Sequence, residues 1–178
     1  MISEVSYPNE NEIKQRAIIA ICRLYCHDQD LLDVGVNERS LTHKLAEYLQ
    51  DEFPEWHVDC EYNRRHDQVK RLHFEGGDIR ADDTEYRAIV PDIIVHRRQT
   101  DQNLIVLEVK KASGSKGTRD FKKLKSFSVE PEYRYRLGLF LRIGKNFDPK
   151  LQVFREGQKV GSWTKDLKRV LRGLGYGG

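Results

Sequence analysis

Two apolar segments separated by a short polar loop constrain the fold of this 178-residue chain more than any other feature. The first segment spans residues 90–96, the second spans 104–111, and the polar loop between them spans 97–103. Segments rich in Val, Ile and Leu on either side of a polar loop predict a β-hairpin whose loop is longer than the shortest type. Because few polar residues interrupt either segment, we expect both strands to lie inside a sheet and to be buried on both faces.

Three charged residues nevertheless lie within these apolar strands: Asp92 in the first, and Glu108 and Lys110 in the second. A buried charge is costly unless it is paired or binds a metal. Glu108 and Lys110 are two residues apart, so they share one face of the strand at a spacing of about 7 Å, and Asp92 can reach the same place from the neighbouring strand. Two carboxylates and an ammonium at one place on an apolar sheet are the components of a divalent-metal hydrolytic site. A purely structural ion pair is the alternative interpretation.

The spacing of these residues resembles the motif of the PD-(D/E)XK nuclease superfamily, whose members have the restriction-endonuclease-like fold. The matching residues are Pro91 and Asp92, followed after an apolar run by Glu108, Val109 and Lys110. The resemblance implies that Asp92, Glu108 and the main-chain carbonyl of Val109 bind Mg²⁺, for which Mn²⁺ can substitute. It also implies that Lys110 places or deprotonates the attacking water.

A fourth candidate residue lies at the start of a predicted helix over 38–52, for which Asn37 is a favourable N-cap. Glu38 begins the apolar stripe of this helix. The segment 38–41, Glu-Arg-Ser-Leu, resembles the first core helix of Holliday-junction-resolvase-like members, which contributes a catalytic Glu. We therefore assign Glu38 to the site, with Glu47 as the alternative helix carboxylate. A Glu in the first turn can also simply complement the helix dipole.

Hydrophobic periodicity predicts the remaining elements. We expect further helices over about 11–27, over 118–127 and from 163 onward. We expect further strands over 56–63 and 134–143, an edge strand over 69–74 and a short hairpin over about 151–157.

The strand over 56–63 alternates between apolar and polar residues, which predicts one face against the core and one face in solvent. The core face would carry Trp56, Val58, Cys60 and Tyr62. The solvent face would carry His57, Asp59, Glu61 and Asn63.

Together these elements predict an α/β fold with a mixed central sheet flanked by helices, in a single domain over 1–178. The core, about 37–143, has the αβββαβ order of the restriction-endonuclease-like fold that the motif resembles. Residues 1–36 would form an N-terminal helical extension, and 144–178 a C-terminal hairpin and helix.

Charge is distributed unevenly along the chain, although the formal net charge is only +3. Residues 1–62 carry 13 acidic and 5 basic side chains, a balance of −8, and the remainder carries 15 acidic and 26 basic side chains, a balance of +11. A basic region around a carboxylate site favours a polyanionic partner, with nucleic acid foremost. The residues we expect to contact phosphate are Lys111, Lys116, Arg119, Lys122 and Lys123. A solvated helix face is the alternative.

Several classes of protein are disfavoured by composition. The first residues are rich in charge, unlike a signal peptide, and no apolar run approaches the length of a membrane span. Three cysteines without a scaffold spacing favour reduced thiols in the cytoplasm.

The sequence therefore predicts a Mg²⁺-dependent endonuclease that hydrolyses phosphodiester bonds, in DNA rather than RNA. The alternative is a non-catalytic module on the same fold that binds nucleic acid or another protein, as a subunit of a defence or repair system. A homodimer and an external specificity subunit both stay open.

Overall fold

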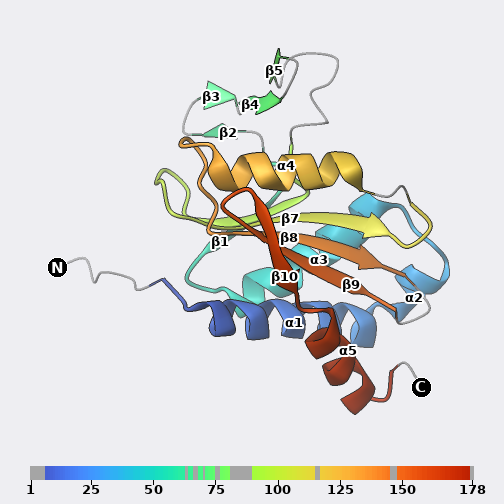
Figure 1. Cartoon of the computed structure of the whole chain (residues 1–178). Coiled ribbons are helices and arrows are strands. Elements are labelled where there is room, and N and C mark those ends of the chain that lie inside the picture. The colour runs from blue at the N-terminus through green and yellow to red at the C-terminus, as the bar shows by residue number, and fades with distance from the viewer. Residues whose placement is uncertain are drawn as a thin grey trace.

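A six-stranded mixed β-sheet lies at the centre of the molecule, with helices on both of its faces (Figure 1). The computed structural model describes residues 7–62, 64–65, 68–69, 71–74, 77–80, 90–114, 117–144 and 148–176. The α/β class and the mixed sheet that the sequence predicted are confirmed.

The central sheet has the strand order β1-β6-β7-β8-β9-β10. Its strands are β1 (His57–Cys60), β6 (Ile93–His96), β7 (Asn103–Lys111), β8 (Leu137–Ile143), β9 (Lys150–Arg155) and β10 (Gln158–Ser162). Strands β7 and β8 are parallel, whereas every other neighbouring pair is antiparallel. The predicted hairpin over 90–111 is confirmed as β6 and β7, which occupy interior positions of the sheet.

Two small hairpins lie between β1 and β6 in the sequence. They pair β2 (Arg64–Arg65) with β3 (Gln68–Val69) and β4 (Arg71–Phe74) with β5 (Gly77–Arg80). The expectation that 69–74 extends the central sheet as an edge strand was therefore wrong. Strand β4 pairs with the next strand in the sequence instead, and it lies beside α4 (Figure 1).

The helices are α1 (Glu10–His27), α2 (Gln29–Asp33), α3 (Glu38–Glu52), α4 (Thr118–Val129) and α5 (Thr164–Gly173). The predicted start of α3 is confirmed, because the Asn37 side chain accepts a hydrogen bond from the Ser40 main-chain N–H at 2.8 Å. The short helix α2 was not among the helices that the sequence predicted. In the described part of the chain, no helix has the length and apolar character needed to cross a membrane.

The sheet separates two hydrophobic cores. Side chains from α1, α3 and α5 pack on one face, and side chains from α4 pack on the other. Successive residues of β7 alternate between them, so Leu107 and Val109 join the larger core while Val106 joins the core under α4. The same alternation places Glu108 and Lys110 on the face covered by α4.

Strand β1 is shorter than predicted, and its alternation ends at Glu61. Glu61 has a φ of +47°, a left-handed conformation that interrupts the strand. Trp56 and Val58 pack against the larger core as expected, but Tyr62 packs against the smaller core on the opposite face. Cys60, which we expected to be buried, is exposed.

The carboxylate of Asp59, expected in solvent, instead connects β1 to β6. Its Oδ2 lies 2.8 Å from His96 Nε2 and accepts a hydrogen bond from Arg98 Nε at 2.9 Å. Burial alone would raise the pKa of Asp59, but the hydrogen bonds from His96 and Arg98 hold it well below its ordinary value. This connection fixes the end of β6 that lies away from Asp92.

Gly117 determines how α4 approaches the sheet, and Gly117→Ala is expected to destabilise the protein by about 2–4 kcal/mol. Its φ is +79°, and an added Cβ would lie 2.6 Å from Cζ of the Phe140 ring. Both the backbone conformation and the close ring disfavour a side chain. The measurement is the free energy of unfolding in urea.

Gly161→Ala is the matched control, because a Cβ there would meet no atom within 4 Å. We expect it to change the unfolding free energy by no more than about 0.5 kcal/mol. Equal stabilities of the two variants would contradict the assigned role of Gly117.

Candidate active site and metal centre

The four predicted site residues come together where β6 begins, β7 ends and α3 begins. Glu38 is the first residue of α3, Asp92 directly precedes β6, and Glu108 and Lys110 lie in β7. Although α3 packs on the opposite face of the sheet from α4, its N-terminus reaches the end of β7, where Glu38 contacts Lys110.

Asp92 continues the strand pairing with its side chain. Pro91, directly before it, has no main-chain N–H, and regular pairing of β6 with β7 begins at Ile93 opposite Leu107. Asp92 Oδ2 accepts the hydrogen bond of the Val109 N–H at 2.7 Å. Because the N–H and C=O of one strand residue point to the same side, the Val109 carbonyl is also directed towards the Asp92 side.

Glu108 is the most constrained charged residue of the site, because its exposed fraction is 0%. Lys123 Nζ lies 2.6 Å from Glu108 Oε2, whereas Glu108 Oε1 has no hydrogen-bond partner among the described residues. Burial raises the pKa of Glu108 well above its ordinary value, the charge of Asp92 adds to the rise, and Lys123 opposes it.

Lys110 is held by two carboxylates. Its Nζ donates to Glu38 Oε1 at 3.3 Å and lies 3.8 Å from Asp120 Oδ2. Burial alone would lower the pKa of Lys110, but Asp120, Glu38 and Asp92 hold it above its ordinary value. Lys110 is therefore a stable ammonium, which suits it to place a water or a phosphate rather than to accept a proton.

Glu38, rather than Glu47, is the helix carboxylate at this place. Glu38 Oε2 also accepts a hydrogen bond from the Lys111 main-chain N–H at 3.0 Å. Glu47 is exposed and lies within ion-pair distance of His43 and Lys44 of its own helix.

Asp120 and Lys123 also belong to the cluster; the sequence prediction did not include Asp120, and it placed Lys123 among the phosphate contacts. Their exposed fractions are 7% and 5%. We expected Lys123 to contact phosphate from an exposed face; this was wrong, because its ammonium is buried against Glu108. Helical spacing carried the signal, since Asp120, Lys123, Leu124 and Phe127 form one i, i+3, i+4, i+7 stripe that is buried against the sheet.

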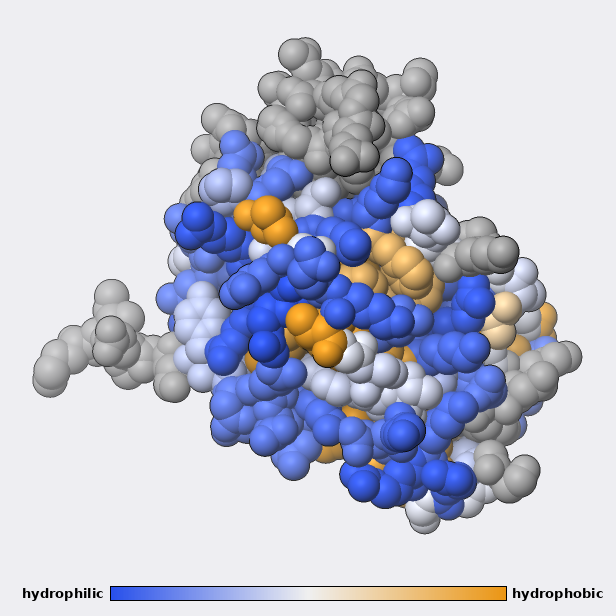
Figure 2. Space-filling model, in the orientation of Figure 1, coloured by the Kyte–Doolittle hydropathy of each residue, from blue (hydrophilic) through white to orange (hydrophobic). Residues whose placement is uncertain are grey.

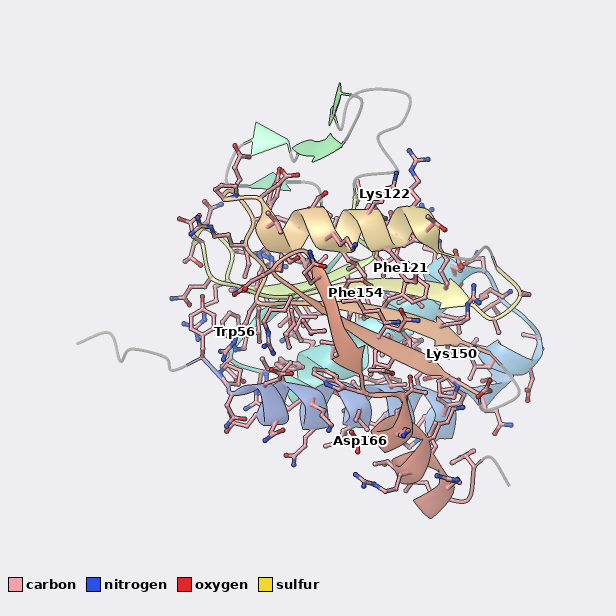
Figure 3. The ribbon with its side chains drawn as sticks, viewed as in Figure 1. Trp56, Phe121, Lys122, Lys150, Phe154 and Asp166 are labelled. Atoms are coloured by element: carbon pink, nitrogen blue, oxygen red, sulfur yellow. The ribbon has the colours of Figure 1, made fainter. Side chains whose placement is uncertain are left out.

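The other expected phosphate contacts occupy different environments. Lys111 Nζ donates to the carbonyls of Gly35 and Val36, at 2.8 and 2.9 Å, and so holds the turn before α3. Arg119 and Lys122 are exposed on α4, and Lys122 points away from the sheet (Figure 3). Lys116 lies outside the described residues. The face that carries α4 and β10 is largely hydrophilic (Figure 2).

A groove of ≈ 660 Å³ leads to Asp92 along the start of α3 and the end of β1. Polar and charged side chains dominate its lining: Asn37, Glu38, Arg39, Thr42, His43, Cys60, Glu61 and Asp92. Through this groove a polar ligand can reach the carboxylates of Glu38 and Asp92, whereas Glu108 does not line it.

The donor set fits a hard divalent cation. No group of three His, Cys, Asp or Glu side chains suited to a metal occurs among the described residues. The oxygens of Asp92 and Glu108, with the Val109 carbonyl, match the preference of Mg²⁺ for one or two carboxylates and several waters. Glu108 Oε1, which is buried and has no hydrogen bond among the described residues, is the observation that favours a cation here.

We predict that Asp92→Asn stabilises the metal-free protein and abolishes metal binding. Burial raises the pKa of Asp92 above its ordinary value, although the Val109 N–H and Lys123 oppose the rise. When the pKa of a carboxyl group is higher in the folded than in the unfolded protein, the protein loses stability as the pH rises above the unfolded-state pKa of about 4. Asn keeps an acceptor for Val109 without the charge. At about pH 7 we expect a gain of about 0.5–2 kcal/mol, measured by urea unfolding without metal.

Asp33→Asn, at the exposed end of α2, serves as the control and should change stability by no more than about 0.5 kcal/mol. A less stable Asp92→Asn protein would instead show that the charge of Asp92 supports the fold.

A comparison of the chain with protein-family models finds no match, and a comparison with curated protein sequences finds none either.

Proposed function

We propose that the protein is a Mg²⁺-dependent nuclease of the PD-(D/E)XK type, which hydrolyses phosphodiester bonds in DNA. RNA is the alternative substrate. The observation that carries this proposal is the placement of Asp92, Glu108, Lys110 and Glu38 at one end of β7, where Glu108 is fully buried and its Oε1 has no hydrogen bond among the described residues.

The order of elements supports a restriction-endonuclease-like fold. Helix α3, strands β1, β6 and β7, helix α4 and strand β8 follow one another as αβββαβ, apart from the small hairpins between β1 and β6. Parallel pairing of β7 with β8 through α4 places α4 over the face that carries Glu108.

In this proposal Asp92, Glu108 and the Val109 carbonyl hold the ion. When bound, Mg²⁺ would lower the pKa of a coordinated water and neutralise the charge that develops on the phosphoryl oxygens. The Val109 N–H fixes the orientation of Asp92 through its 2.7 Å hydrogen bond. The Lys110 ammonium places the attacking water and stabilises negative charge at the phosphate. Glu38 positions Lys110 and is itself fixed by the Lys111 N–H.

A polyanionic substrate is supported by the charge distribution. Residues 63–178 carry 15 acidic and 26 basic side chains, and Arg119 and Lys122 are exposed on α4, the helix that also carries Asp120 and Lys123. All three cysteines are free, which supports a reducing compartment such as the cytoplasm.

A non-catalytic module on the same fold is the second candidate, and one observation favours it. The ammonium of Lys123 already lies 2.6 Å from Glu108, so this carboxylate has a cation without any metal. Under this alternative the charged cluster would be structural, and neither Mn²⁺ binding nor cleavage would be measurable.

We predict that Lys110→Met lowers the cleavage rate by at least about a hundredfold, the usual scale for a positioned catalytic group. Met keeps most of the apolar stem and removes the charge. The protein should still fold and bind Mn²⁺, because the proposed ligands are intact. Cleavage is measured on labelled single-stranded, duplex and branched DNA and RNA, with and without Mg²⁺ or Mn²⁺.

Lys159→Met, an exposed change on β10, is the control and should cleave at the wild-type rate. A purely structural cluster predicts instead that Lys110→Met loses about 3–5 kcal/mol of stability and that the wild type cleaves nothing. A Lys110→Met protein with wild-type activity would exclude the catalytic role.

A double variant with Arg119→Gln and Lys122→Gln is expected to weaken nucleic-acid binding in a salt-dependent way. Each lost phosphate contact should flatten the plot of log affinity against log salt by about one unit. Binding is measured by fluorescence anisotropy at several salt concentrations, without divalent metal. An unchanged slope would assign this part of α4 to a merely solvated face.

A further inference from the structure

The Lys123 ammonium occupies a position beside Glu108 that conflicts with a metal ion bound to the same carboxylate oxygen. Its Nζ lies 2.6 Å from Glu108 Oε2 and donates a hydrogen bond to the Val90 carbonyl at 3.3 Å. The Lys123 side chain is 6% exposed and that of Glu108 is 1% exposed, so little water screens the pair. The ammonium therefore acts as a cation permanently available to this carboxylate.

An ammonium and a divalent ion on one buried carboxylate repel each other strongly, because charges interact more strongly where water is excluded. Glu108 Oε2 faces Lys123, and burial of the whole side chain leaves no solvent to separate the two cations. Binding of an ion to Glu108 is therefore favoured if Lys123 moves away.

Asp120 provides the place to which the Lys123 ammonium can move. Its Oδ1 lies 3.8 Å from Lys123 Nζ, just beyond hydrogen-bond distance, and the two residues are neighbours on one face of α4. Asp120 is 7% exposed and already lies 3.8 Å from Lys110 through its other oxygen. A small rotation of the Lys123 side chain would exchange Glu108 for Asp120 without leaving a buried ammonium unpaired.

We infer that Lys123 is the resident cation of Glu108 and that its ammonium transfers to Asp120 when a divalent ion binds. This inference rests on the proposed metal site. It makes Lys123 a competitor of the metal and Asp120 the acceptor that allows the exchange. The affinity of the site for metal is then determined by α4 as well as by the ligands on β6 and β7.

Metal binding to variants tests the exchange. We expect Lys123→Met to bind Mn²⁺ at least about tenfold more tightly than the wild type, because the competing cation is gone. Asp120→Asn should bind Mn²⁺ at least about tenfold more weakly, because the displaced ammonium loses its acceptor. Calorimetry at about pH 8.5 limits competition from protons. Lys125→Met is the control, since Lys125 is exposed on the same helix, and its affinity should equal that of the wild type.

A crystal structure of the wild type grown with Mn²⁺ decides the matter even if Lys123→Met fails to fold. Lys123 Nζ nearer to Asp120 than to Glu108 supports the exchange. Lys123 still paired with Glu108 beside a bound ion, or weaker binding by a folded Lys123→Met protein, overturns this inference alone. No Mn²⁺ binding by the wild type overturns the proposed function as well.

Discussion

The rest of the site depends on the ion pair between the buried carboxylate of Glu108 and the ammonium of Lys123. Glu108 lies inside the central sheet with an exposed fraction of 0%, where an uncompensated charge would be strongly destabilising. Helix α4 supplies the compensation through Lys123, and it does so because its buried stripe packs against β7, β8 and β9. The turn at Gly117, which lets the backbone approach Phe140, sets the start of that helix. The backbone turn at Gly117 thus helps to position the helix whose Lys123 compensates the charge of Glu108.

The site also joins the two layers of the molecule. Glu38 belongs to a helix that packs on one face of the sheet, whereas Asp120 belongs to a helix on the other face. Both contact Lys110, Glu38 at 3.3 Å and Asp120 at 3.8 Å, because the end of β7 leaves the ammonium accessible from both sides. The cluster can therefore form only when both layers are packed on the sheet. A perturbation of either core is expected to reach the site through this lysine.

The sequence was sufficient for the parts of the site that follow from local periodicity. Alternation along β7 placed Glu108 and Lys110 on one face, whereas Glu38 was assigned from its place at the start of the apolar stripe of α3 together with the resemblance of residues 38–41 to resolvase-like members. It failed where one residue departs from the regular pattern or where tertiary burial overrides residue type. The left-handed φ of Glu61 ended the alternation of β1 and moved Tyr62 to the other face. Lys123 was expected in solvent because lysine is rarely buried, and only a buried carboxylate opposite it makes such burial tolerable.

The charge balance of the cluster connects stability to ligand binding. Four carboxylates and two ammonium groups, if all are ionised, leave a formal charge of −2: Glu38, Asp92, Glu108 and Asp120 against Lys110 and Lys123. Burial raises the pKa of both Asp92 and Glu108, and the negative charge of the neighbouring carboxylates adds to the rise, whereas Lys123 opposes it. One divalent ion would neutralise the excess. At a concentration of about a hundred times its Kd, such an ion would stabilise the folded protein by about 2.7 kcal/mol. A loss of stability without the ion and a gain on binding is what the proposed metal site predicts, whereas a structural ion pair predicts no such gain.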